Sequence, residues 1–70
     1  MRRFLVVIEK TDAGYSAYSP DLPGCIATGQ AKEEAKKNMY EALQFHIQGL
    51  IEDNVTVPEN TSFAEFMEVA

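Results

Sequence analysis

The sequence has few of the residues that build reactive or metal-binding sites. It contains one cysteine, one histidine and no tryptophan among its 70 residues. A single cysteine excludes a disulfide within the chain, and one cysteine with one histidine leaves no Cys/His cluster for a structural metal. We expect no metal and no cofactor. A chain of this length buries only about 60% of the surface that its unfolded form exposes, so self-association is its remaining source of stability.

Long hydrophobic runs are also absent. The apolar run at residues 4–8 follows Arg2 and Arg3 and has five residues. That length is far below the ~20 residues of a membrane-spanning helix and below the ~7–15 residues of a signal-peptide core. We therefore expect a cytoplasmic protein that binds no membrane.

Positive charge is missing from the second half of the chain. All six basic residues lie at or before Lys37. The acidic residues that follow without a basic neighbour are Glu41, Glu52, Asp53, Glu59, Glu65 and Glu68. Because an acidic surface repels phosphate, we expect no direct binding of nucleic acid, whereas a basic protein partner is attracted. The alternative is that these charges only keep the surface solvated.

Residues 14–29 have the pattern of two strands joined by a stiff corner. Residues 15–18 alternate as a strand does, and residues 25–28 resume apolar and β-branched character. The predicted structural loop between them consists of Pro20, Asp21, Leu22, Pro23 and Gly24. Proline fixes φ and glycine allows a positive φ, so the loop has a defined shape. We expect the Asp21 carboxylate to accept hydrogen bonds from N–H groups within this loop.

Two further periodic segments flank this corner. Residues 4–8 are rich in β-branched residues and predict a first strand that pairs with residues 15–18 as a hairpin. From residue 31 to residue 54, apolar residues recur at spacings of three and four, which predicts a long amphipathic helix. Its N-cap residue, Ala31, has no side-chain acceptor, so we expect a frayed start.

The segment after the helix predicts one more element. Residues 66–69 can form a short closing strand beside the first strand and parallel to it. Alternatively, residues 63–67 form a helical turn, because Ser62 and Glu65 match a capping box. The predicted fold is α+β with the order β-β-β-α-β: two layers, with a mixed, mostly antiparallel sheet and one long helix on one face. Residues 1–70 are expected to form a single domain.

A second apolar line flanks the first on the helix, so the combined apolar surface is wider than one sheet can cover. It consists of Tyr40, Ile47 and Ile51. We expect a homodimer or homotetramer that uses these residues. The alternative is that they pack beneath Phe63 and Phe66 of the same chain.

Several motifs in residues 4–58 resemble the HicB family of antitoxins. The specific match is Tyr-x-Ala-x-x-Pro-Asp-Leu-Pro-Gly-Cys at residues 15–25, followed by Glu-Glu-Ala at residues 33–35. The resemblance implies a fold like a truncated ribonuclease H domain. It also implies that the chain binds HicA, a small basic ribonuclease toxin, and covers the catalytic histidine of HicA. The acidic candidates for this contact are Glu41, Glu52, Asp53, Glu65 and Glu68.

Two other functions stay open. Members of this family usually carry a DNA-binding segment after this domain, but no second helical period or basic patch follows here, so we expect no separate DNA-binding domain. The chain could then be a solitary oligomeric scaffold that binds no toxin. The ribonuclease H likeness also suggests a divalent-metal nuclease using Glu9, Glu41 and Glu68.

The chemistry-bearing residues favour binding over catalysis. Glu9 stands at the end of its predicted strand, where a solvent-facing charge is ordinary. His46 lies beside the apolar stripe of the helix without a second histidine or a nearby nucleophile. Cys25 has no basic neighbour and is expected to be a small buried apolar residue. We therefore expect a protein that is not an enzyme.

Overall fold

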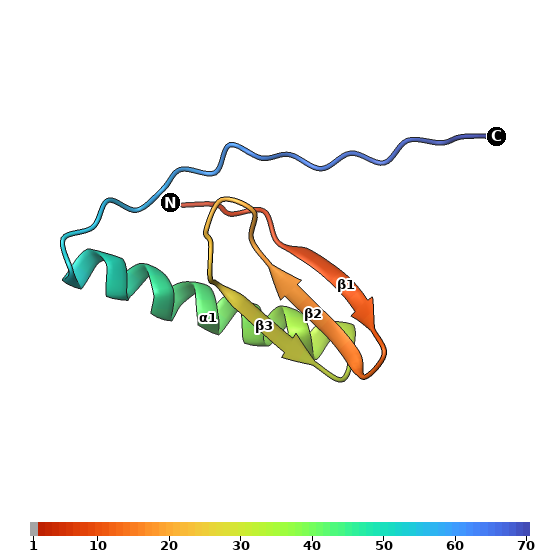
Figure 1. Cartoon of the computed structure of the whole chain (residues 1–70), viewed down its shortest axis with the longest axis horizontal. Helices are drawn as coiled ribbons and strands as arrows, with labels where there is room; N and C mark the ends of the chain where they lie inside the picture. The colour runs from red at the N-terminus through yellow and green to blue at the C-terminus, as the bar shows by residue number, and fades with distance from the viewer. Residues whose placement is uncertain (1) are drawn as a thin grey trace.

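The fold is a three-stranded antiparallel sheet with one helix lying across one face (Figure 1). The computed structural model describes residues 2–70. The elements are β1 (Val7–Thr11), β2 (Gly14–Tyr18), β3 (Ile26–Gly29) and α1 (Lys32–Glu52). In the sheet order β1-β2-β3, β1 and β3 are the edge strands. The α+β class, the β-β-β-α order and the single long helix are thus confirmed; the likeness to a ribonuclease H domain stays a prediction.

The first strand begins three residues later than its apolar run predicts. It spans Val7–Thr11 instead of residues 4–8. Val7 pairs with Tyr18, the last residue of β2, and the chain turns at Pro20 two residues further on. Since proline has no N–H to donate to a ladder, β2 cannot extend and residues 4–6 have no strand beside them.

The closing strand predicted at residues 66–69 is not formed by the single chain. Residues 55–70 contain neither a strand nor the helical turn predicted as its alternative. Figure 1 shows this segment running back past the N-terminal stretch and on beyond the sheet. The sheet is consequently antiparallel throughout, and the outer edge of β1 carries no neighbouring strand.

The core lies between the sheet and α1. Its buried residues are Ala17, Leu22, Cys25, Ala35 and Met39. Ile8 and Ala27 pair with Ala17 from the two neighbouring strands and therefore share its face of the sheet. Leu22 reaches this core from the corner loop, so the loop contributes to the core as well as to the turn.

Both ends of α1 are stabilised by contacts with the flanking chain. Ala31 is the N-cap residue and makes no side-chain capping bond, as expected. However, the N–H of Gln30 donates to Oε1 of Glu34 at 2.6 Å, a contact similar to one half of a capping box. At the other end, Asn54 has a φ of 57°, and the N–H of Val55 donates to the carbonyl of Leu50 at 2.8 Å. This Schellman-type end reverses the chain.

Candidate functional site

The corner loop is tied to the C-terminal segment through Asp21. The Asp21 carboxylate accepts hydrogen bonds from the N–H of Ser62 at 2.8 Å, the N–H of Thr61 at 2.9 Å and the hydroxyl of Thr61 at 3.1 Å. Its partners are therefore not the N–H groups of its own loop, as the sequence predicts, but groups 40 and 41 residues further along. The loop itself is held by backbone bonds, from Leu22 N–H to the Ser19 carbonyl and from Cys25 N–H to the Leu22 carbonyl, both at 3.2 Å.

We call the hydrogen bonds that Thr61 and Ser62 donate to Asp21 the tether, and its stability should depend on pH. The hydrogen bond from the backbone of Ser62 holds the pKa of Asp21 below its ordinary value of 3.8. A group whose pKa is lowered in the folded state contributes stability that is present above its unfolded pKa and is lost as the pH falls through the folded pKa. We expect hydrogen-exchange protection of the Thr61 and Ser62 amides to be full well above pH 3.8 and to disappear in stronger acid. Asp21→Ala should remove this protection at every pH.

The control for this experiment is Asp12→Ala, which removes an exposed carboxylate from the turn between β1 and β2. It should leave the protection of the Thr61 and Ser62 amides unchanged. Equal protection in Asp21→Ala and the parent chain would contradict the tether.

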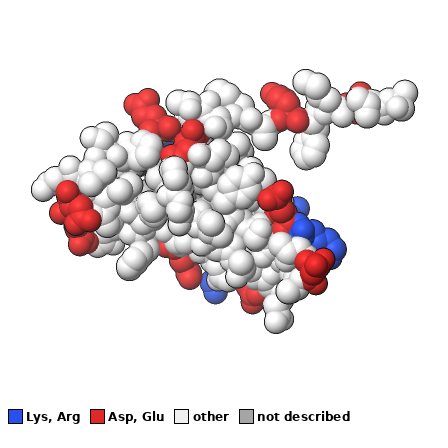
Figure 2. Space-filling view, viewed as in Figure 1, with Lys and Arg blue, Asp and Glu red and all other residues white. Residues whose placement is uncertain are grey.

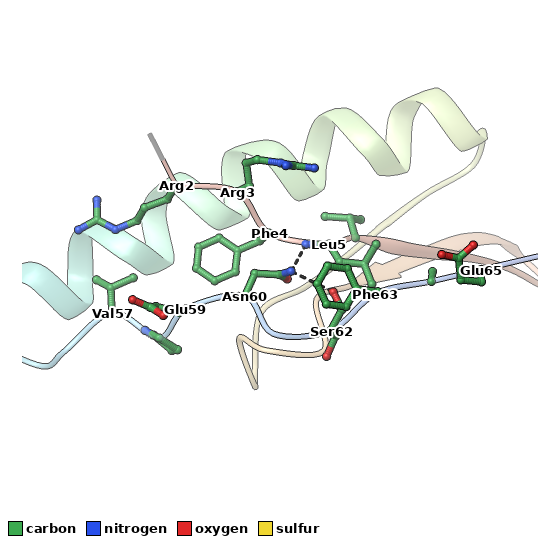
Figure 3. A pocket seen from close by; sticks show the side chains of 13 residues that line it. Arg2, Arg3, Phe4, Leu5, Val57, Glu59, Asn60, Ser62, Phe63 and Glu65 are labelled. Carbon is green, nitrogen blue, oxygen red and sulfur yellow. Dashed lines mark hydrogen bonds between the residues drawn. The ribbon is translucent and has the colours of Figure 1, made fainter.

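Next to this tether, the N-terminal stretch and the C-terminal segment enclose a groove (Figure 3). We call it the tail groove; its walls are residues 2–6, 57–60 and 62–65, and its volume is about 890 Å³. The N–H of Leu5 donates to Oδ1 of Asn60 at 2.9 Å, and Nδ2 of Asn60 donates to the Ser62 carbonyl at 3.0 Å. A side chain thus spans the gap, so the two extended stretches lie side by side without forming a strand pair.

Asn60 and Thr61 are positioning residues that the sequence does not mark. The run Asn60, Thr61 and Ser62 after Pro58 looks like an ordinary extended connection. The only available signal is three consecutive side chains that can form hydrogen bonds. Which partners they take depends on contacts with residues 5 and 21, and a local pattern does not contain that information.

The three residues predicted to form an oligomer interface differ in their exposure to solvent. Tyr40 and Ile51 are more than half exposed, whereas Ile47 is partly buried and packs against the core. The alternative, packing of these residues beneath Phe63 and Phe66, is wrong because both phenylalanine side chains project into solvent.

The acidic candidates for partner binding are all exposed but do not form one patch. Three lie on α1 or at its end and two lie on the extended segment; they are Glu41, Glu52, Asp53, Glu65 and Glu68. Figure 2 shows acidic side chains in separate groups, including one at the C-terminal end of α1 and others along the extended segment. A basic partner that contacts both sets has to span the molecule.

The structure does not assemble a reaction centre from the candidate residues. Within residues 2–70, no three His, Cys, Asp or Glu side chains come together in a group that could hold a metal ion, so Glu9, Glu41 and Glu68 stay apart. Cys25 is buried and its burial raises the pKa of the thiol, which confirms it as a packing residue. His46 is half-buried on α1. Over the same described range, no helix has the length and apolar character needed to cross a membrane.

These features define a small α+β domain. A model of the HicB-like antitoxins of bacterial toxin–antitoxin systems matches residues 4–70. The chain therefore belongs to this family, which confirms the resemblance seen in its motifs. Antitoxins of these systems are not enzymes, in agreement with the expectation from the sequence.

Relatives of known sequence and structure are similar over most of the chain. An uncharacterised 14.9 kDa protein of Haemophilus phage HP1 is 37% identical over 62 residues, which is 89% of this chain and 47% of that protein. A UPF0150 protein of Synechocystis is 40% identical over 57 residues, 80% of this chain and 72% of that protein. The chain thus spans about half the length of the phage relative.

A solved structure supports the same relationship. A chain of the HicA3 and HicB3 toxin–antitoxin complex matches with a TM-score of 0.69 and 29% identity. The match covers 84% of this chain and 72% of that chain.

Proposed function

We propose that this protein is a cytoplasmic antitoxin that binds a small basic HicA-type ribonuclease toxin and occludes it. The observation that carries this proposal is the structural match to a chain of the HicA3 and HicB3 complex, at 29% identity over 84% of the present chain. The net charge of −5 supports a basic partner. We further propose that the protein acts as a homodimer or homotetramer and binds no nucleic acid directly.

Occlusion needs no chemistry from the antitoxin. A ribonuclease is inactive when RNA cannot reach its catalytic histidine, so a domain docked over that residue is sufficient. Packing across the contact supplies most of the affinity, and complementary charge mainly raises the association rate and the specificity. The acidic residues of α1 and of the extended segment are the proposed source of this attraction.

Reconstitution with the toxin tests the proposal directly. A small basic HicA-type toxin is purified and mixed with this chain, and cleavage of a fluorogenic RNA is followed. We expect a stable complex and loss of cleavage at equimolar protein. Failure of the two proteins to associate, or full cleavage within a formed complex, would overturn the proposed function.

Charge-neutral variants test which acidic residues contribute. A helix set carries Glu41→Gln, Glu52→Gln and Asp53→Asn, and a tail set carries Glu65→Gln and Glu68→Gln. The matched control set changes three exposed acidic residues near the hairpin and the start of α1: Glu9→Gln, Asp12→Asn and Glu33→Gln. At low salt we expect the helix set to lower the association rate constant about tenfold, with a smaller decrease for the control set. Equal effects of the helix set and the control set would contradict the proposed role of Glu41, Glu52 and Asp53 in attracting the toxin.

A further inference from the structure

Gly49 lies in the interior of α1, and nothing within the chain requires a glycine there. Glycine weakens a helix relative to alanine, so it is useful where a positive φ or a close approach of other atoms demands it. Neither condition applies at this position. The glycines with positive φ are Gly14 and Gly24, and a Cβ atom placed on Gly49 meets nothing within 4 Å. The missing side chain leaves an open notch on the exposed surface of the helix.

Phe45 stands one turn before this notch and on the same side of the helix. Residues four apart are neighbours on a helix surface. The side chain of Phe45 is 82% exposed, more than any other large apolar residue of the sheet and helix. A single exposed phenylalanine is ordinary, but a projecting aromatic ring directly beside an open notch has the relief that a complementary protein surface fits, and aromatic residues are enriched in such contacts.

The charged residues next to this pair are acidic. Glu41 lies one turn before Phe45, and Glu52 lies seven residues, or about two turns, after it on the same side. The basic residues of α1 are confined to its first six residues, and its last turn contains none. We call Glu41, Phe45, Gly49 and Glu52 the notch face. It consists of an apolar pair with a carboxylate at each end.

The notch face opens beside the β3 edge of the sheet. Asn38 lies seven residues before Phe45 and therefore on the same side of α1, and its Nδ2 donates to the carbonyl of Thr28 on β3 at 2.8 Å. β3 is one edge strand and β1 is the other (Figure 1). The arginines of the tail groove belong to the stretch before β1. The two surfaces can therefore be altered independently.

We propose that the notch face is the surface of α1 that docks on the HicA-type toxin, with Phe45 entering an apolar recess of the toxin and a toxin side chain filling the notch at Gly49. This inference rests on the proposed function. A basic partner is favoured because lysine or arginine around the recess would meet a carboxylate at each end of the apolar pair. A second copy of this chain is disfavoured, since a two-fold contact through the same face brings the glutamates of one copy towards those of the other.

Substitutions at Gly49 separate docking from folding. Gly49→Ala and Gly49→Leu fill the notch with side chains of increasing size, and both new residues have a higher helix propensity than glycine. We expect the melting temperature of the chain, followed by circular dichroism, to rise in both variants. Calorimetric titration with the toxin should show a higher Kd for Gly49→Ala and a Kd about 30-fold higher or more for Gly49→Leu. A purely structural role of Gly49 would move stability and affinity in the same direction.

Substitution of Phe45 tests the other half of the contact. Phe45→Ala should raise the Kd for the toxin about 30-fold or more. Its matched control is Tyr40→Ala, which removes another exposed aromatic side chain of α1. Tyr40 is five residues away and so faces a different side of the helix, and its loss should change the Kd less than about fivefold. A benzophenone amino acid in place of Phe45 should cross-link to the toxin under ultraviolet light, whereas the same group in place of Tyr40 should not.

The outcomes distinguish this inference from the function on which it rests. If the parent chain binds the toxin, and Phe45→Ala and Gly49→Leu bind it with the same Kd, the notch face is overturned while the proposed function stands. Cross-linking from position 40 but not from position 45 would equally overturn the notch face. Failure of the parent chain to bind the toxin would overturn both.

Discussion

Leu22→Ala is expected to lower the free energy of unfolding by about 2–5 kcal/mol. Leu22 is 1% exposed and, with Met39, is one of the two largest fully buried side chains. It lies in the turn between Pro20 and Pro23, whose backbone is fixed by two backbone hydrogen bonds. A rigid loop cannot collapse into the space that the lost methyl groups leave, so the cavity should persist.

The size of the domain makes this loss decisive. Folded proteins retain roughly 0.05–0.15 kcal/mol of stability per residue, which is only several kcal/mol for a chain of this length. We therefore expect the variant to be largely unfolded at 37 °C, as measured by urea denaturation followed by circular dichroism. Ile26→Ala is the matched control. It removes an aliphatic side chain of the same size that is largely exposed on β3, and it should cost less than about 1 kcal/mol. Similar losses for both variants would contradict the role of Leu22 in the core.

Gly29→Ala is expected to destabilise the chain by about 1–3 kcal/mol, through overpacking instead of a cavity. A Cβ atom on Gly29 would lie 2.5 Å from the backbone nitrogen of Ala35 and 2.9 Å from the carbonyl carbon of Glu34. These atoms belong to the first turn of α1 and cannot rotate away as the end of a side chain can. The end of β3 and the start of α1 must therefore separate.

The control is the same glycine-to-alanine change at Gly49, and it is expected to affect stability in the opposite direction. Gly49 lies within α1, and a Cβ atom placed there meets nothing within 4 Å. Gly49→Ala should stabilise the helix by up to about 1 kcal/mol, because alanine has the higher helix propensity. Thermal melts of the two variants should therefore move in opposite directions. A gain in melting temperature for Gly29→Ala would show that the close approach of β3 and α1 is not a packing constraint.

Local patterns in the sequence were sufficient for the local elements. The spacing of apolar residues from 31 to 54 predicts α1, which spans Lys32–Glu52. The turn formers between residues 18 and 25 predict the corner, and Cys25 is buried as expected. Each of these inferences uses residues within one or two turns of each other, where hydrophobic period and backbone preference act directly.

Features that depend on distant partners were not predictable in this way. The apolar run at residues 4–8 marks a strand, but its position is set by how far β2 reaches before Pro20. The acceptor role of Asp21 was anticipated, whereas its donors at Thr61 and Ser62 were not, because they lie 40 and 41 residues away. The closing strand predicted at residues 66–69 beside the first strand is absent from the three-stranded sheet, because whether such a segment pairs depends on contacts far from it in the sequence.

The chain reversal at Asn54 also divides the sequence into a part that builds the core and a part that does not. The buried residues extend only from Ala17 to Met39, and α1 ends at Glu52. The interior between the sheet and α1 is therefore complete without Phe63 and Phe66, which lie beyond the reversal and are largely exposed.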